Sequence, residues 1–259
     1  MAEGDTVHRH ARRIAAALGE DPLQRATAPA PKSPLRLQGE RLAALAGCRL
    51  EGAEARGKHL LLTFEGELIL HSHLGMRGSW QLHRPGERWR WPLRTAWAVL
   101  TTEAVEVAQF GGSRLGLRTE AEVRRDPRLR SLGPDILDPA FAPEAGVAAL
   151  RGFPQERELG EALIDQRVLA GVGNVYKSEA CFAARIGPHR RLGELSDEEL
   201  ARVVVEAASL MLAGSRTGER PRDVYRRAGR PCLRCGEPIR SRGQGDANRS
   251  TFWCPGCQG

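Results

Sequence analysis

Four of the six cysteines form two closely spaced pairs near the end of the chain. CLRC supplies Cys232 and Cys235, and CPGC supplies Cys254 and Cys257. Two CxxC pairs with a spacer of this length are typical of four thiolates that hold one zinc ion in a tetrahedron. Because four thiolates leave no open position for water, we predict one structural Zn2+ rather than a catalytic one. Disulfides or free thiols are the alternatives, and disulfides fit poorly with a cytosolic chain.

The segment between the two pairs, GEPIRSRGQGDANRSTFW, predicts two short strands around a glycine-rich turn. It is too small to bury a core, so the metal must fold it as a zinc-ribbon hairpin. Arg240, Arg242 and Arg249 give this hairpin the charge to contact a nucleic-acid groove or backbone. Zinc ribbons occur in many classes of protein, so the hairpin alone does not decide the function.

Two shorter motifs also carry residue types that could do chemistry. In VLAGVGN, Gly171 and Gly173 precede a predicted helix with Asn174 at its N-cap. Free N–H groups and the helix dipole at such a point attract an anion, although an ordinary helix–turn–helix corner is the alternative. In HLGMRGSW, Met76 and Arg77 lie in a glycine-flanked turn. A methionine there can act as an apolar wedge in a duplex, or it can fold into the local core.

The elements that must position these residues fall into an N-terminal β-rich part and a helical part. Residues 5–19 predict one helix that Asp5 can cap, followed by several strand-like runs with turns between them. This pattern indicates a β-sandwich or barrel with the first helix packed on it, and Lys58 lies at the start of one strand. The apolar stripe of the helix contains Val7, Ala11, Ile14 and Leu18.

Helical periodicity begins at about residue 131, after which SLGPDILDP reads as a turn-rich boundary. Ser196 is placed to cap a long amphipathic helix further on. We therefore expect three domains: residues 1–130, residues 131–228, and the four-cysteine module of residues 229–259.

Composition bounds the possible partners. The 259 residues carry 39 lysines and arginines against 32 aspartates and glutamates, a formal net charge of +7. Lysine occurs only at Lys32, Lys58 and Lys177, so arginine supplies most of the charge, which favours a polyanion. No apolar run is long enough to span a bilayer and no export signal is evident, so we expect a cytoplasmic protein without a membrane partner. Cys48 and Cys181 are isolated and are expected to be buried, inert thiols.

Together these motifs resemble the formamidopyrimidine-DNA glycosylase/endonuclease VIII family of base-excision repair enzymes, along essentially the whole chain. The EGDT opening is more similar to the endonuclease VIII branch. The matching stretches, in order, are EGDT, RGKHLLL, HLGMRGSW, LGPD, DQRVLAGVGNVYKSEA, VYRRAGRPC and the NRSTFWCPGC ending.

The resemblance implies an α+β fold: an N-terminal helix on a two-layer β-sandwich, a helix–two-turns–helix domain and a C-terminal zinc hairpin. It implies a bacterial monomer that binds damaged double-stranded DNA between its domains, kinks it and flips out the damaged nucleotide. Nucleoid association would follow from that binding.

The resemblance also assigns roles to single residues. The α-amine of Ala2, freed by removal of Met1, would attack the sugar, with Glu3 as acid/base. Lys58, Asn174 and Arg249 would grip phosphates. Met76, next to Arg77, would fill the vacated stack. An α-amine has a pKa of about 7.7–8.0 against about 10.4 for lysine, so a useful fraction is nucleophilic at neutral pH. The alternative role of Glu3 is a first-turn glutamate that complements the helix dipole.

Residue 2 departs from the family, which has proline there. Proline gives a permanently cationic iminium, whereas the imine of Ala2 must first be protonated. A reactive natural variant, an engineered inactive form and a natural non-catalytic binder are the three explanations. Lys58 is a possible substitute amine if burial lowers its pKa strongly.

A second departure concerns the loop that probes the opposite strand. The formamidopyrimidine branch has paired arginines there, whereas this chain has AQFGGSR with Phe110. This difference favours oxidised pyrimidines or abasic sites over 8-oxoguanine. We therefore predict a bifunctional DNA glycosylase/AP lyase that cleaves by β/δ-elimination. A catalytically silent binder of damaged DNA is the alternative, and a zinc-ribbon nucleic-acid protein with a coincidental N-terminal motif is a third.

Overall fold

The computed structural model describes residues 2–259, and these divide into two compact units. The N-terminal unit contains Ala2 and residues Thr6–Arg130, and the C-terminal unit contains Glu3–Asp5 and Ser131–Gly259. The expected removal of Met1 lies outside the described residues. Within residues 2–259, no helix is long and apolar enough to cross a membrane.

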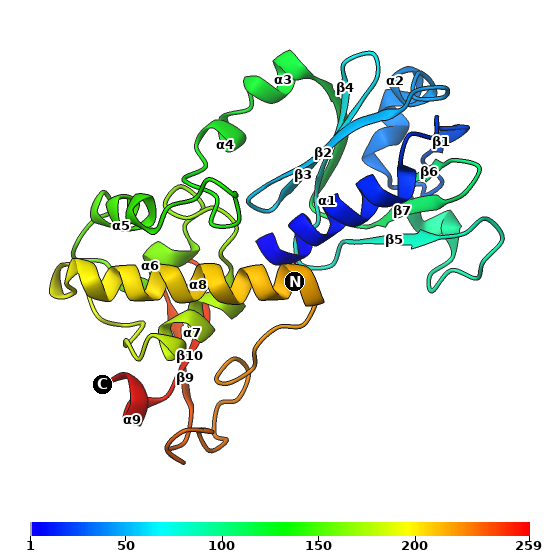
Figure 1. Ribbon diagram of the computed structural model, residues 1–259. Coiled ribbons are helices and arrows are strands. Elements are labelled where there is room, and N and C mark those ends of the chain that lie inside the picture. The colour runs from blue at the N-terminus through cyan, green and yellow to red at the C-terminus, as the bar shows by residue number, and fades with distance from the viewer. Residues whose placement is uncertain (1) are drawn as a thin grey trace. The chain divides into compact units, whose positions relative to one another are not determined.

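The N-terminal unit is built from two four-stranded antiparallel sheets (Figure 1). One sheet has the order β1 (Arg25–Thr27), β6 (Ala96–Thr101), β7 (Glu106–Phe110), β5 (Ser79–His83). The other has the order β2 (Leu50–Arg56), β3 (His59–Phe64), β4 (Leu68–His73), β8 (Arg114–Thr119). The short helices of the unit are η1 (Pro34–Gln38), α2 (Gly39–Ala43), η2 (Leu93–Thr95), α3 (Glu120–Arg124) and α4 (Pro127–Arg130). Leu62, Leu70, Leu100 and Val107 bring both sheets into one core, so the predicted β-sandwich is confirmed.

Helix α1 (Gly4–Leu18) packs its apolar stripe into that core. Val7, Ala11, Ile14 and Leu18 are each at most 4% exposed, as the spacing predicted. The prediction that Asp5 caps the helix was wrong, because the helix already begins at Gly4. The Asp5 carboxylate is instead bound by side chains of the C-terminal unit, to which residues 3–5 belong.

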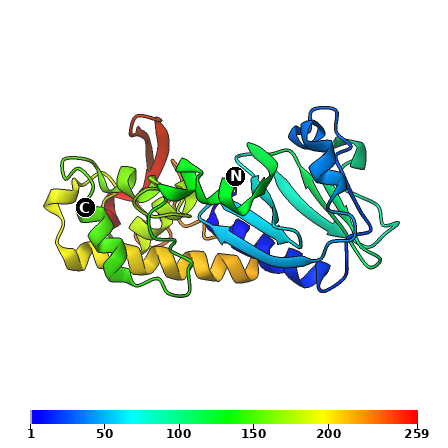
Figure 2. The ribbon, with the colours of Figure 1, turned by 90° about the horizontal axis from the view of Figure 1, so that it is seen from above.

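The C-terminal unit is a cluster of helices followed by a β-hairpin. The hairpin is coloured orange to red in Figures 1 and 2. Its elements are α5 (Pro143–Arg151), α6 (Leu159–Ile164), α7 (Asn174–Ala183), η3 (Leu192–Glu194), α8 (Asp197–Thr217), β9 (Arg240–Gln244), β10 (Arg249–Trp253) and α9 (Pro255–Gln258). Ser196 caps α8 by accepting from the Glu199 N–H, as expected. The core between these helices includes Leu163, Tyr176, Val203 and Met211. The strands β9 and β10 confirm the predicted hairpin.

Two local predictions need correction. Asn174 is the first residue of α7 rather than its N-cap, which is Gly173. The extended backbone of Gly173 allows any residue, but its missing side chain leaves room for a close neighbour. Cys181 is buried as expected, whereas Cys48 is only half-buried, because Cys48 lies in the loop after α2 rather than inside an element.

Candidate active site and zinc centre

The carboxylate of Glu3 lies at the N-terminus of α7. Its Oε1 accepts the backbone N–H of Val175 (3.0 Å), and its Oε2 accepts that of Tyr176 (3.4 Å). The first N–H groups of a helix lack partners within the helix and favour a negative charge, so this position stabilises the carboxylate. Glu3 is fully buried. The anion attracted by the glycine turn is therefore, in this structure, a side chain of the protein itself.

The two glycines of VLAGVGN make this approach possible. A Cβ at Gly173 would lie 2.2–2.6 Å from atoms of the Glu3 side chain, which no packing tolerates. Gly171 has φ +94°, a conformation that favours glycine, and its carbonyl accepts the N–H of Gly4 (2.9 Å). The spacing of both glycines before α7 is therefore explained by Glu3 and Gly4.

Ala2 lies beside the turn that carries Met76. The backbone nitrogen of Ala2 donates to the carbonyl of Gly75 (3.3 Å), and its side chain packs on the sandwich core. Met76 is 68% exposed and Arg77 is exposed too, so the alternative of a methionine folded into the core does not apply. Ala2, the proposed nucleophile, is thus hydrogen-bonded to the residue that directly precedes Met76, the proposed wedge.

Asp5 belongs to a buried polar group that sequence reasoning missed. Arg220 donates to both of its carboxylate oxygens, at 2.8 Å from Nε and 2.5 Å from Nη2. The Tyr176 hydroxyl donates to the same carboxylate (3.1 Å), and burial raises the pKa of this phenol far above its usual value. The group fixes the residue two places after Glu3. No local pattern could predict it, because Asp5 and Arg220 are 215 positions apart.

Lys58 lies in the turn between β2 and β3, half-buried. Three histidines follow it on the sheet: His59 pairs with His73 across β3 and β4, and the ring nitrogens of His59 and His71 are 2.9 Å apart. Burial is the main cause that lowers the pKa of His59 to about 3 and that of His71 to about 4. All three rings are therefore neutral at pH 7. The alternation in LILHSH, which places His71 and His73 on one face of a strand, was the signal for this cluster.

Phe110 is 5% exposed and packs edge-on against Trp91, with a ring-centroid distance of 5.3 Å. Trp89 also contacts the same ring. The ring is therefore buried against two tryptophans of the segment between β5 and η2. Contact of Phe110 with DNA remains a prediction.

Asn174 and Arg249 come from α7 and β10 of the same unit. The Asn174 side-chain nitrogen donates to the Ser250 carbonyl (2.7 Å), the residue after Arg249. The Asn174 side-chain oxygen is buried, and no donor among residues 2–259 reaches it. Arg249 is exposed. The helix and the hairpin therefore bring two of the three proposed phosphate contacts together.

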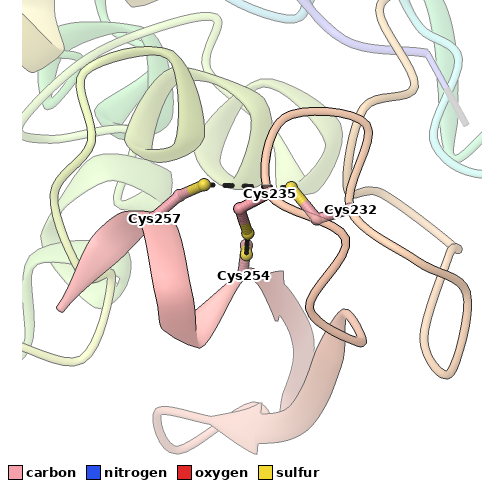
Figure 3. Close-up of side chains that lie close together, drawn as sticks. All are labelled: Cys232, Cys235, Cys254 and Cys257. Carbon is pink, nitrogen blue, oxygen red and sulfur yellow. Dashed lines mark hydrogen bonds between the residues drawn. The ribbon is translucent and has the colours of Figure 1, made fainter.

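The four cysteines of the two CxxC pairs converge at the base of the hairpin (Figure 3). Their sulfur atoms all lie within 4.8 Å of one another, with 3.9 Å between Cys232 and Cys257 and 3.4 Å between Cys235 and Cys254. A tetrahedron with Zn–S bonds of about 2.3 Å requires S···S separations of about 3.8 Å. The donor set and its spacing therefore fit zinc. Among residues 2–259, no other group of three or more metal-ligating side chains is so arranged.

Comparison with known proteins agrees with this arrangement. Residues 1–117 match the formamidopyrimidine-DNA glycosylase N-terminal domain, and residues 132–222 match the formamidopyrimidine-DNA glycosylase H2TH domain. The chain is 42% identical to a probable endonuclease 8 2 of Streptomyces coelicolor, over 100% of this chain and 94% of that protein. It is 34% identical to the DNA-(apurinic or apyrimidinic site) lyase Nei2 of Mycolicibacterium smegmatis, over 100% and 99%.

The fold agrees as well. The crystal structure of the MutM (Fpg) protein from Thermus thermophilus superposes with a TM-score of 0.80 at 29% identity, covering 99% of this chain and 98% of that one. The chain belongs to the formamidopyrimidine-DNA glycosylase/endonuclease VIII family, on its endonuclease VIII-like side. A zinc-ribbon protein with a coincidental N-terminal motif is therefore excluded.

Proposed function

We propose that this protein is a bifunctional DNA glycosylase and abasic-site lyase of base-excision repair. The observation that carries the proposal is the fully buried Glu3 carboxylate, held by two N–H groups of α7 directly after residue 2. Relatives matched over the whole chain carry endonuclease 8 and abasic-site lyase names, which supports the same activity. Their names do not support a catalytically silent binder.

In this mechanism, the α-amine of Ala2 forms a bond to C1′ of a flipped deoxyribose. The bond from C1′ to the base breaks, and Glu3 transfers the protons that the departing base and the opening sugar ring require. The resulting imine, once protonated, acidifies the C2′ hydrogens. Loss of one of them breaks the C3′–O bond by β-elimination, and a second elimination breaks the C5′–O bond.

A second set of residues is proposed to hold the DNA. Lys58, Asn174 and Arg249 are proposed to bind phosphates around the lesion, and the exposed Met76, beside Arg77, to fill the vacated stack. Lys58 is half-buried. It is the substitute amine in this proposal if Ala2 does not react. One Zn2+ on Cys232, Cys235, Cys254 and Cys257 would hold the hairpin that carries Arg249.

Without paired arginines beside Phe110, we infer oxidised pyrimidines and abasic sites in double-stranded DNA as substrates. We further propose that the protein acts as a monomer of three domains with limits near residues 130 and 228, and that it works on the nucleoid of a bacterial cytoplasm.

Borohydride trapping on abasic-site DNA tests the proposal. A covalent adduct on the N-terminal peptide is the expected result, with Met1 absent from the mature chain by mass spectrometry. An adduct on Lys58 would move the nucleophile but keep the lyase. Tight binding of abasic-site DNA with no adduct and no strand cleavage would contradict the proposal and leave a silent binder.

A further inference from the structure

Lys177 is a fully buried lysine in α7, three residues after Asn174. Its ammonium donates to the Thr251 hydroxyl (2.5 Å) and to the Gln244 side-chain oxygen (3.3 Å). Both acceptors are neutral and both lie on the zinc hairpin, one on each strand. A lysine is almost never buried without a paired charge, because removing an ammonium from water is costly. Packing alone gives no reason for a charge at this position.

Gln244 extends the contact to a second helix. Its side-chain nitrogen donates to the Glu158 carboxylate (2.7 Å) and to the Pro188 carbonyl (2.8 Å). Its oxygen accepts from Lys177 and from Thr251 (2.6 Å). The amide therefore has no remaining freedom to rotate. Because Glu158 is the N-cap of α6, the network joins α6, α7 and both hairpin strands.

The same network sets the position of Arg249. Gln244 and Arg249 are direct partners across β9 and β10. On α7, Asn174 binds the Ser250 carbonyl and the Ser178 hydroxyl accepts the Phe252 N–H (3.4 Å), so Lys177 acts between two further anchors. One face of α7 thus holds the middle of β10, from Ser250 to Phe252.

We propose that Lys177 is a positioning residue for DNA binding: through Thr251 and Gln244 it fixes the zinc hairpin on α7, and its charge lies directly beneath the phosphate grip of Asn174 and Arg249. The inference rests on the proposed function, since it assumes that this grip holds DNA. Because Lys177 is fully buried, it acts through these partners rather than by touching phosphate or sugar.

The charge of Lys177 is sensitive to its surroundings. Burial lowers its pKa to about 8. A bound phosphate stabilises the ammonium form, so DNA affinity should be highest while Lys177 is protonated and should fall as the pH rises through about 8. The titratable and charged groups that act on it are Glu3, Glu158, Cys181, His189 and Arg249.

The test compares Lys177→Met with Lys32→Met, which removes the same charge from an exposed lysine. Affinity for a duplex with a tetrahydrofuran abasic-site analogue is measured from about pH 6.5 to 9.5. We expect Lys177→Met to bind about tenfold more weakly at neutral pH, equivalent to about 1.4 kcal/mol, and to lose the fall in affinity near pH 8. Lys32→Met should keep both properties. The α-amine also titrates in this range, but it is present in every variant, so the difference between profiles isolates Lys177.

Stability and metal content separate this role from a structural one. Methionine fills the space of the lysine stem but donates to neither Thr251 nor Gln244, so Lys177→Met should keep its zinc and melt only slightly below the wild type. If Lys177→Met fails to fold, Thr251→Val replaces it in the test. This variant removes one acceptor of the Lys177 ammonium, and valine is well suited to a β-strand. A zinc-loaded Lys177→Met or Thr251→Val with wild-type affinity and pH profile would overturn the inference. A wild-type chain that neither binds the duplex nor forms a borohydride adduct would instead refute the proposed function.

Discussion

At the scale of single residues, the decisive feature is Glu3, an acid whose partners are backbone groups. Two N–H groups of α7 hold the carboxylate, and Gly173 gives it the space to reach them. Hydrogen bonds from backbone donors define a position more narrowly than a flexible ion pair does. This accounts for an acid next to the N-terminus better than the helix dipole of α1 alone.

Glu3→Gln tests the acid/base role with an almost isosteric side chain. An amide oxygen can still accept from α7, but it cannot carry a proton, so we expect base release to slow by about 10²–10⁴-fold. Single-turnover release of an oxidised pyrimidine from duplex DNA measures this. Binding of an abasic-site analogue should change little. Wild-type rates in this variant would show that Glu3 has only a structural role.

Gly173→Ala should also slow base release, because the new methyl group would displace the Glu3 carboxylate from the N-terminus of α7. Its backbone conformation suits alanine, so the expected effect comes only from the collision of the new Cβ with the Glu3 side chain, at 2.2–2.6 Å. We expect a loss of activity comparable to that of Glu3→Gln, measured by the same assay. Gly152→Ala, where the nearest atoms lie at 3.5 Å, is the matched control and should remain active.

At the scale of elements, the zinc hairpin has little apolar support of its own. Its small core joins Phe182 and Val224 to Ile239 and two of the cysteines. A metal ion on the four cysteines would therefore supply much of the free energy that orders β9 and β10. The contacts with α7 then place the ordered hairpin against the helical cluster.

Cys235→Ser should remove both the metal and the DNA affinity. We expect zinc content to fall from about one equivalent to near zero, because three thiolates and a hydroxyl bind zinc much less tightly. Metal analysis after dialysis and binding of abasic-site DNA measure the two effects. Cys48→Ser alters a half-buried thiol in the N-terminal unit, so it should keep both the zinc and the DNA affinity. Equal metal content in Cys235→Ser would contradict the site.

His59 in β3 and His71 in β4 should make the N-terminal unit less stable at acidic pH. Burial depresses the folded-state pKa values of His59 and His71, so only the unfolded chain takes up their protons below about pH 6.5. Stability should therefore fall as the pH drops from about 6.5 towards 4, by up to about 1.4 kcal/mol per pH unit for each histidine. Urea unfolding followed by tryptophan fluorescence measures this, since four of the five tryptophans lie in this unit. His71→Met should make the pH dependence shallower; an unchanged slope would contradict the cause.

At the scale of the whole molecule, the net charge of +7 draws the chain to DNA of any sequence, while a few positions specify the grip. Many exposed arginines are already paired, as Arg41 is with Glu122 and Arg167 with Asp165. The 39 lysines and arginines therefore overstate the number of phosphates that the protein can neutralise.

The salt dependence of DNA binding should reveal that number. Removing a single phosphate contact reduces the slope of log K against log salt by about 0.9. We expect this change for both Lys58→Ala and Arg249→Ala, measured between about 50 and 200 mM salt. Lys32→Met should leave the slope as it is. A slope unchanged in both alanine variants would remove these residues from the phosphate grip.

The sequence predicted whatever depends on near neighbours. The four cysteines, the stripe of α1 and the β9–β10 hairpin each follow from patterns over a few residues, and the family resemblance supplied their order. What it could not predict joins distant positions. The ion pair of Asp5 with Arg220 and the network of Lys177 with Gln244 and Thr251 depend on side chains that only the fold brings together.

The burial of Lys177 has a practical consequence for protein chemistry. Among the three lysines of this chain, only Lys32 is well exposed and Lys58 is half-buried. After the proposed removal of Met1, an acylating reagent at mildly acidic pH would favour the α-amine of Ala2, because its reference pKa is the lowest among the amino groups of this chain. A fluorophore or affinity tag could be attached there selectively. In the proposed mechanism the same modification would block turnover, so the reagent would inactivate the enzyme without any mutation.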